Sequence, residues 1–405
     1  MPIVVQKYGG SSVADPDKFR AVAKRVMRTR DLGHQVVVVV SAMGDTTDHL
    51  LELAKNVSAN PERRELDLLL SVGERISMAL LSMAISDLGG SAISFTGSQA
   101  GIITNDRHVD ARIIEVRPFR VQDELARGNI VIIAGYQGVS YRREVTTLGR
   151  GGSDTTAVAM AAALDAEWCE ICSDVDGVYS ADPRVVPGVK RISTLSHEET
   201  QELAEAGAKV LNAQAVEFAK ERGIAIYARA TGQPPPGDSE LTDGTIVRKF
   251  ASRPPGTVIG IASEKDLLLL LADGRSDELF EFLDDQNVCG KQLHLASTAD
   301  ICTIATVISR ENLHDEDRFR SRLTEKFDAT VRLVEGIGAV SAIGAGINTS
   351  YKNLRAGSAA LASLQVLGVS TSSFRITWLI PAASVDTAVH ALHQTFIDAM
   401  PHPVP

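Results

Sequence analysis

The chain has 405 residues and a formal net charge of −10, from 41 Lys and Arg against 51 Asp and Glu. At roughly 150 residues per domain, this length predicts about two to three domains. The acidic balance argues against broad nucleic-acid binding, which needs many phosphate-neutralising cations, yet it leaves room for one small phosphate site with a local positive field.

The four cysteines are too few for a disulfide framework and favour a reducing compartment. Cys169 and Cys172 stand three apart in an apolar run, so we expect buried strand cysteines whose side chains point to opposite faces. Metal or redox chemistry is the lesser alternative, because no second Cys or His pair follows at zinc-ligand spacing. The N-terminus has no signal-peptide pattern and no apolar stretch reaches the ~18–20 residues that span a bilayer, so the expected location is the cytoplasm.

Short β-rich runs alternate with helical patterns over about the first 230 residues, which predicts a mainly parallel α/β sheet covered on both faces. Asp15 and Pro16 suit the cap and the first position of a helix. Five consecutive valines indicate a strand buried on both sides, and residues 62–88 form one long helical pattern. The expected strands are 3–6, 36–40, 92–96, 130–134, 169–173 and 224–228.

The chain changes character near residue 250, where two Pro- and Gly-rich stretches indicate loops. The following residues use shorter units in a βαββαβ order and then a partial second copy. In this tail, strands at 330–334 and 339–343 are assigned to different modules. We therefore expect an α/β/α sandwich at 1–250, followed by two ferredoxin-like modules at 257–335 and 336–405.

Two glycine-containing turns follow predicted strands and carry groups suited to anions. Lys7 precedes Gly9 and Gly10, whose backbone can approach a phosphate, and a helix N-terminus is expected just beyond. A plain strand-to-helix turn with a surface lysine fits these residues equally well. Arg150 offers a fork for a carboxylate or phosphate, whereas Asp154 by itself is best explained as a helix cap.

A third turn, at residues 173–184, contains Tyr179, Asp182 and Arg184, which offer groups suited to a nucleobase, a ribose and a phosphate. A plain polar loop would also explain its acidic residues. Glu74 lies in an apolar helical pattern and cannot face the adjacent Arg75, so we favour a site role for this carboxylate. His108 and His197 have no partners at triad or metal spacing and are expected to be solvated. Three such turns are what phosphoryl transfer requires, since it depends on positioning and on neutralising charge.

Together these motifs resemble those of the aspartokinases in the amino-acid kinase family. The matching segments are 6–13 (QKYGGSSV), 41–48 (SAMGDTTD), 73–77 (GERIS), 95–101 (FTGSQAG), 134–139 (AGYQGV), 147–157 (TLGRGGSDTTA) and 173–184 (SDVDGVYSADPR). The resemblance implies transfer of the ATP γ-phosphoryl group to the β-carboxylate of L-aspartate, giving 4-phospho-L-aspartate on the way to aspartate semialdehyde, lysine, threonine and methionine. Mg²⁺ would bridge the phosphates, and no general base is needed because the carboxylate is already ionised.

The family pattern also implies a role for individual residues. Lys7, which would neutralise the transferred phosphoryl group, and Asp182 are the expected catalytic residues. The expected ATP-binding residues are Lys7, Gly9, Gly10, Ser41, Ser173, Asp174, Tyr179, Asp182, Arg184 and Lys209. The expected aspartate-binding residues are Thr47, Glu74, Arg150, Gly151, Gly152, Ser153 and Asp154. Among these, Arg150 would clamp the α-carboxylate, while Glu74 and Asp154 would receive the α-amino group.

The family carries two C-terminal ACT modules that pair between subunits and bind lysine or threonine as feedback inhibitors. The resemblance therefore implies a homodimer or higher homo-oligomer, with no nucleic-acid or membrane partner. This chain departs from the family motifs at 273–276 (DGRS), 292–294 (QLH), after 344–346 (GAG) and at 371–375 (TSSFR). We expect weakened feedback. The alternatives are a kinase of this fold acting on a related amino acid and a non-catalytic regulatory paralogue.

Overall fold

The computed structural model describes residues 1–149, 151–208, 211–235, 244–251, 253–274, 276–297, 302–311, 313, 315–327 and 330–399. The chain divides into two compact units. The N-terminal unit comprises Met1–Val178, Arg191–Ala204 and Lys209–Ser252, and the C-terminal unit comprises Tyr179–Lys190, Glu205–Ala208 and Arg253–Pro405. Two short segments therefore fold with the C-terminal unit although they precede the expected boundary near residue 250. The three-domain division stays a prediction.

An eight-stranded sheet forms the centre of the N-terminal unit, with the order β10-β12-β11-β9-β1-β2-β6-β3. Its strands are β1 (Ile3–Tyr8), β2 (Gln35–Val40), β3 (Ala92–Phe95), β6 (Ile130–Ala134), β9 (Trp168–Ser173), β10 (Thr194–Ser196), β11 (Ala225–Ala230) and β12 (Thr245–Arg248). Of these neighbouring pairs only β11–β12 is antiparallel. The five valines of β2 are all buried, as their run predicted.

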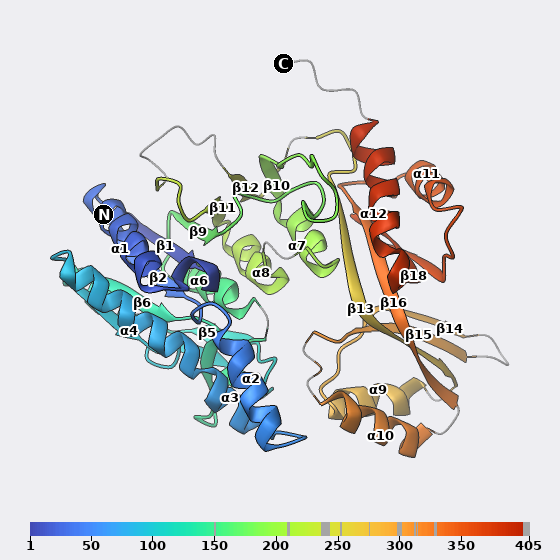
Figure 1. Ribbon diagram of the computed structural model, residues 1–405, viewed down its shortest axis with the longest axis horizontal. Helices are drawn as coiled ribbons and strands as arrows, with labels where there is room; N and C mark the ends of the chain where they lie inside the picture. Colours follow the sequence, from blue (N-terminus) through green and yellow to red (C-terminus); the bar gives the residue numbers. More distant parts are fainter. Residues whose placement is uncertain are drawn as a thin grey trace. The chain divides into compact units, whose positions relative to one another are not determined.

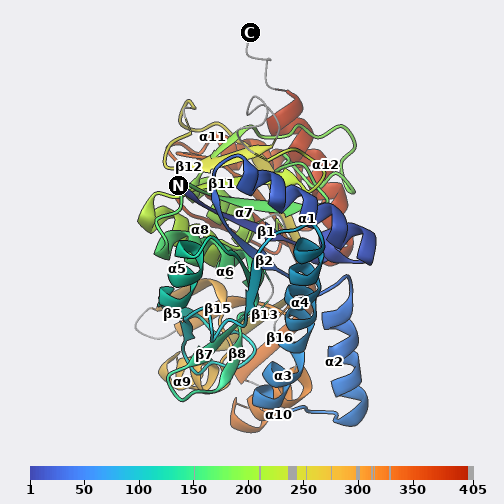
Figure 2. The same cartoon turned by 90° about the vertical axis from the view of Figure 1, so that its left-hand side faces the viewer.

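Helices cover both faces of this sheet. Figure 2 shows α1 (Pro16–Asp31) and α4 (Val72–Asp87) on one side of β1 and β2, and α5 (Phe119–Ala126), α6 (Gly152–Ala163) and α8 (Ala213–Arg222) on the other. The remaining helices are α2 (Thr46–Val57), α3 (Arg63–Leu70) and α7 (His197–Glu205). Asp15 caps α1 as expected, because its side chain accepts the Lys18 N–H at 2.9 Å.

A second, four-stranded sheet was not predicted. It has the order β5-β4-β7-β8 and consists of β4 (Ile102–Thr104), β5 (Ile113–Val116), β7 (Gln137–Ser140) and β8 (Val145–Thr147). Strands of three or four residues are too short to give a clear alternating pattern. This sheet matters for function because β8 leads directly into the turn before α6.

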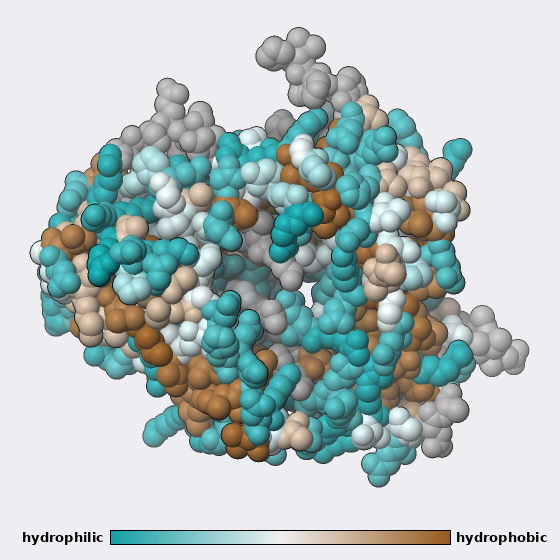
Figure 3. Space-filling view, in the orientation of Figure 1, coloured by the Kyte–Doolittle hydropathy of each residue, from teal (hydrophilic) through white to brown (hydrophobic). Residues whose placement is uncertain are grey.

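The long helix expected at 62–88 is two helices, α3 and α4, which meet at Ser71. The stretch Arg63–Asp87 is long and apolar enough to cross a membrane by length and composition, contrary to our expectation for this chain. Its α4 part packs on the sheet with a face that includes Glu74 and Ser77. The opposite face exposes Val72, Ile76, Leu80 and Met83, which contribute to the apolar band visible over α3 and α4 (Figure 3).

The C-terminal unit contains a six-stranded antiparallel sheet with the order β14-β15-β13-β16-β18-β17. Its strands are β13 (Gly260–Asp273), β14 (Lys291–Ser297), β15 (Cys302–Ser309), β16 (Val331–Ile343), β17 (Gly368–Thr371) and β18 (Arg375–Pro381). The strands expected at 330–334 and 339–343 are one continuous strand, β16, which pairs with β13 along its length. The two modules therefore share their central strands.

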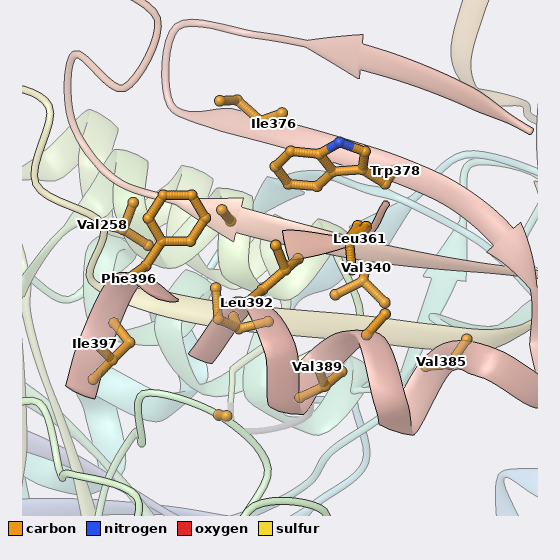
Figure 4. Packing of buried hydrophobic residues seen from close by; sticks show 14 of the residues in the cluster. Val258, Val340, Leu361, Ile376, Trp378, Val385, Val389, Leu392, Phe396 and Ile397 are labelled. Carbon is orange, nitrogen blue, oxygen red and sulfur yellow. The ribbon is translucent and has the colours of Figure 1, made fainter. Parts of the chain in front are cut away.

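Two apolar cores stabilise this unit at different parts of the sheet. Figure 1 shows α9 (Ser276–Asp285) and α10 (Glu316–Phe327) toward one end of β13 and β16, and α11 (Lys352–Ala360) and α12 (Val385–His393) toward the other. The first core contains Phe282, Phe319 and Phe327. The second surrounds Trp378 and includes Val340 and Leu392, as Figure 4 shows.

Candidate active site

Lys7 lies near the carboxyl end of β1, the edge at which parallel sheets present ligands. Its Nζ is 2.7 Å from Asp154 Oδ1, and the two side chains are only 12% and 10% exposed. Asp154 is the third residue of α6 rather than its cap, which corrects the prediction from the residue alone. Gly151 occupies the cap position with φ +72°, a conformation that glycine adopts without strain. Asp154 is therefore free to pair with Lys7.

The turn after β1 approaches the turn after β2 very closely. A Cβ on Gly10 would lie 2.8 Å from the Ala42 carbonyl oxygen, so only glycine fits. The Gly9 N–H donates to the Cys172 carbonyl at 3.2 Å, and the Ser41 N–H donates to the Tyr8 carbonyl at 3.0 Å. Gly9, Gly10 and Ser41 thus come together. A 3₁₀ helix, Gly10–Val13, follows directly, and the expected helix N-terminus lies just beyond it, where α1 begins at Pro16.

Glu74 supplies a buried carboxylate to the turn after β2. Its side chain accepts the Ala42 N–H at 3.1 Å through Oε1, while Oε2 is buried and has no hydrogen-bond partner among the described residues. Burial raises the pKa of Glu74 to about 7. Arg75 turns instead to Gln137. Thr47 is the second residue of α2 and is partly exposed.

The turn before α6 is closely packed. A Cβ on Gly151 would lie 2.7 Å from Asn212 Nδ2, and one on Gly152 would lie 2.7 Å from Leu148 Cβ. Ser153 Oγ lies 2.7 Å from the position that a Cβ on Gly135 would occupy. Arg150 and Lys209 lie outside the described residues.

Asn212 is a polar residue of this turn that the sequence analysis missed. It caps α8 by accepting the Gln214 N–H at 2.8 Å, and the same Oδ1 accepts the Thr155 hydroxyl at 3.1 Å. An asparagine before a helical pattern signals a cap, but its second partner comes from α6, far away in the chain.

Hydroxyl groups link the ends of three neighbouring strands. The Thr231 N–H and hydroxyl donate to the Ser173 carbonyl at 2.9 and 3.0 Å, and the Thr231 and Ser12 hydroxyl oxygens are 2.6 Å apart. Ser173 therefore lies beside the turn after β1, while Asp174 is exposed. Ser12 stands in the quoted segment 6–13 but received no role of its own from the sequence, and Thr231 received none, because a single hydroxyl after a strand carries no distinctive spacing.

The segment 179–190 belongs to the C-terminal unit, so the expected ATP-binding residues are divided between the two units. Asp182 accepts the Arg184 backbone N–H at 2.9 Å and lies 2.7 Å from its Nη2. Tyr179 is partly exposed. Ala181 and Val186 anchor the segment in the core around Trp378.

A Ser–His–Asp series also holds this segment. Ser180 Oγ is 3.0 Å from His393 Nε2, and His393 Nδ1 is 3.3 Å from Asp398 Oδ2. A catalytic serine must be accessible to substrate, whereas Ser180 is buried and its Oγ accepts the Lys190 N–H at 3.1 Å. The series is an anchor for residues 179–190.

Both histidines expected to be solvated are paired, so that prediction is wrong. His197 is 1% exposed and its Nε2 lies 3.2 Å from the Ile224 carbonyl, and burial lowers its pKa. His108 Nδ1 lies 2.5 Å from Asp67 Oδ2. Both partners are distant in the sequence, which spacing rules cannot detect.

Cys169 and Cys172 are free and fully buried in β9, as predicted. Burial raises the pKa of both thiols, that of Cys172 to about 12, so neither is a ready thiolate. Within the described ranges, no group of three His, Cys, Asp or Glu side chains could hold a metal ion.

Comparison with known proteins covers nearly the whole chain. Residues 2–228 match the amino acid kinase family. The aspartokinases of Mycolicibacterium smegmatis and Corynebacterium glutamicum are 44% and 41% identical to this chain. Each alignment covers 98% of this chain and 96% of the relative. The crystal structure of Escherichia coli aspartokinase III with aspartate and ADP has a TM-score of 0.84 at 25% identity, covering 97% of this chain and 99% of that one.

These matches confirm the predicted fold, a largely parallel central sheet followed by ACT-like sheets. They also support an enzyme, because the chain aligns with aspartokinases over almost its full length. The chain therefore belongs to the amino-acid kinase family and is an aspartate kinase that uses ATP.

Proposed function

We propose that this chain transfers the γ-phosphoryl group of ATP to the β-carboxylate of L-aspartate, giving 4-phospho-L-aspartate and ADP. The observation that carries the proposal is the buried Lys7–Asp154 pair beside the Gly9–Gly10 turn. A carboxylate oxygen forms a bond to the γ-phosphorus while the bond from that phosphorus to the bridging oxygen breaks. The nucleophile is ionised at neutral pH, so positioning and charge neutralisation supply the catalysis.

Aspartate binding would rearrange the charges at Lys7. Asp154 and Glu74 are proposed to receive the α-ammonium group, with Thr47 orienting the substrate and Arg150 holding the α-carboxylate. The unpartnered Glu74 Oε2 supports this, since a buried carboxylate with a raised pKa gains from a cation. When Asp154 turns to the ammonium group, Lys7 is released toward the transferred phosphoryl. Gly151, Gly152 and Ser153 would form the wall of this site.

ATP is proposed to bind at the linked ends of β1, β9 and β11. The proposed contacts are Lys7, Gly9, Gly10, Ser41, Ser173, Asp174, Tyr179, Asp182, Arg184 and Lys209, and Asp182 is proposed to act with Lys7 in catalysis. Mg²⁺ is proposed to enter with ATP, held mainly by phosphate and water oxygens, where it would neutralise phosphate charge.

A coupled assay of ADP formation tests the reaction and its substrate. We expect turnover to depend on aspartate and to exceed turnover with glutamate by about 100-fold or more, since the site is shaped for one chain length. Identifying the product as an acyl phosphate by its reaction with hydroxylamine completes the test. Faster turnover with another amino acid would favour the related-substrate alternative.

We also propose that lysine and threonine inhibit this enzyme weakly. The motif departures in the C-terminal unit motivate the proposal, and local pairing supports it. The Asn348 side chain already donates to the Ser372 and Arg375 carbonyls, the latter at 3.1 Å, which leaves fewer free backbone groups at that turn. Strong inhibition of the pure enzyme by millimolar lysine plus threonine would contradict the proposal.

The six-stranded sheet of the C-terminal unit is the proposed site of homo-oligomer formation. Its edge strands are β14 and β17, on which Leu293, Leu295 and Val369 are exposed. Exposed apolar edges favour pairing with another strand. Sedimentation of the parent and of Leu293→Lys would test this, with dissociation expected for the variant. We further propose a cytoplasmic location and a place at the start of aspartate-derived amino-acid biosynthesis.

A further inference from the structure

Asp67 on α3 is a buried carboxylate with no part in the proposed reaction. Its side chain is 0% exposed, and its oxygens are surrounded by donors from two other segments. His108 Nδ1 lies 2.5 Å from Oδ2, while Oδ1 accepts the Val109 N–H at 3.0 Å and the Thr147 hydroxyl at 2.5 Å. A fully buried carboxylate is costly without such compensation, so this arrangement requires all three partners.

The loop that carries His108 is held in an unusual conformation. Val109 has φ +74°, a left-handed value that is strained for a β-branched residue. The bond from its N–H to Asp67 offsets that strain, and its side chain is buried. The Ala111 N–H donates to the Thr147 carbonyl at 2.9 Å. Asp67 therefore fixes both the loop and the strand residue against which the loop packs.

Thr147 is the last residue of β8 and leads into the turn before α6. The next residue, Leu148, donates its N–H to the Tyr136 carbonyl at 2.9 Å, and its Cβ would meet a Cβ on Gly152 at 2.7 Å. Gly152 in turn donates to the Gly149 carbonyl at 3.0 Å. Because these contacts leave little free space, a shift of Thr147 is passed to the turn and to the start of the helix that carries Asp154.

We propose that Asp67 and His108 are positioning residues for aspartate, acting through Thr147 on the turn around Gly149 and Gly151. Neither residue touches substrate, because Asp67 is enclosed by protein and His108 is directed to it. The inference rests on the aspartate-binding role proposed above for this turn. Loss of the link weakens aspartate binding far more than ATP binding.

A matched pair of variants at Thr147 tests the link with the least change in packing. Thr147→Val keeps the shape but removes the hydroxyl, and Thr147→Ser keeps the hydroxyl. We expect Thr147→Val to raise the KM for aspartate about tenfold or more, since it removes a hydrogen bond to a charged group. Thr147→Ser is expected to stay within about twofold, and the KM for ATP within about twofold in both.

A second pair tests His108 itself. The side-chain amide of His108→Asn can replace the Nδ1–H donor, whereas His108→Ala cannot, so the aspartate KM should rise in the alanine variant and recover in the asparagine variant. Glu124→Gln is the control for loss of a buried carboxylate in the same unit, because Glu124 pairs only with Arg127 and Asn129 in the contacts described and does not reach the turn. Its aspartate KM should not change.

Hydrogen exchange separates this inference from the proposed reaction. Without substrate, amides of residues 145–149 should exchange faster in Thr147→Val than in Thr147→Ser or the parent. If the parent shows no aspartate turnover, the proposed reaction fails, and the exchange result still decides whether Asp67 holds the turn. The inference would be overturned if the two Thr147 variants had equal exchange rates and equal KM values for aspartate. It would also be overturned if Thr147→Val raised the KM for aspartate and the KM for ATP equally.

Discussion

The two units of this molecule bury different kinds of side chain. Among the residues that the structure describes, the buried carboxylates and guanidinium groups all lie in the N-terminal unit: Arg25, Asp67, Glu74, Glu124, Asp154, Glu170, Glu199 and Arg229. In the described part of the C-terminal unit, His393 is the one buried residue with an ionisable side chain. Burying charge is costly, so each of these groups requires a compensating partner or a ligand.

Most of these buried charges are compensated within the protein. Glu170 on β9 lies 2.5 Å from Arg25 Nη2 and accepts the Gln6 amide at 3.0 Å, which joins α1 to two central strands. Asp67 has three donors, as described above. Arg229 and Glu74 are compensated less completely, because two guanidinium nitrogens of Arg229 and Glu74 Oε2 have no hydrogen-bond partner among the described residues. Arg229 still lies 3.7 Å from the opposite charge of Glu170. Most of these charges therefore build the scaffold, whereas the open oxygen of Glu74 is consistent with the ligand-binding role proposed for it.

Lys7→Ala should have the largest effect on this comparison. Removing the cation proposed to neutralise the transferred phosphoryl group should lower kcat by about 100- to 1,000-fold or more. Steady-state assays with saturating ATP and aspartate would measure it, with circular dichroism to show that the variant is folded. Lys18→Ala, at an exposed lysine of α1, is the control and should keep full activity. Near-parent activity of Lys7→Ala would refute the role of Lys7.

Trp378→Ala tests the C-terminal unit, whose stability rests on apolar packing. Trp378 is fully buried and its Nε1–H donates to Ser358 Oγ at 3.1 Å. Truncation should lower the free energy of unfolding by about 3–5 kcal/mol through lost contacts and a new cavity. Denaturant unfolding would measure the loss. Trp378→Phe retains an aromatic ring and should lose less, and equal losses would show that packing volume is not the cause.

Glu74→Gln should separate function from stability. Because burial raises its pKa from 4.5 to about 7, the folded protein binds more protons than the unfolded chain between these values. The stability of the parent should therefore fall as pH rises through this window, by about 3 kcal/mol in all. The variant should lose this dependence and be more stable at pH 8, while its aspartate KM rises. Thermal unfolding from pH 5 to 8 would show whether the two profiles differ.

His393→Ala should have the smallest effect of the four. The change leaves Ser180 Oγ without its ring partner and should lower the free energy of unfolding by about 1–3 kcal/mol. Hydrogen exchange in residues 179–190 should become faster, because the segment loses one anchor. His390→Ala, at an exposed histidine of the same helix, is the matched control. Equal exchange in the two variants would show that the apolar contacts of the segment suffice.

Sequence patterns predicted the local elements well where neighbouring residues determine them. The valine run of β2 and the Asp15 cap of α1 agree with the structure, because periodicity and capping act over a few residues. The break between α3 and α4 and the continuity of β16 were missed. A helix break or a shared strand depends on what packs against it, and no local pattern records that.

The sequence by itself determined the fold class, the glycine turns after β1 and before α6, and the site roles expected for Lys7 and Glu74. Only the tertiary structure decided which groups pair. It brings Lys7 to Asp154 and His108 to Asp67 on α3, and it assigns the segment 179–190 to the C-terminal unit. The physical reason is the range of the forces. Backbone propensities act between neighbours in the chain, whereas a buried charge is compensated by whichever group the packed fold brings within hydrogen-bond distance.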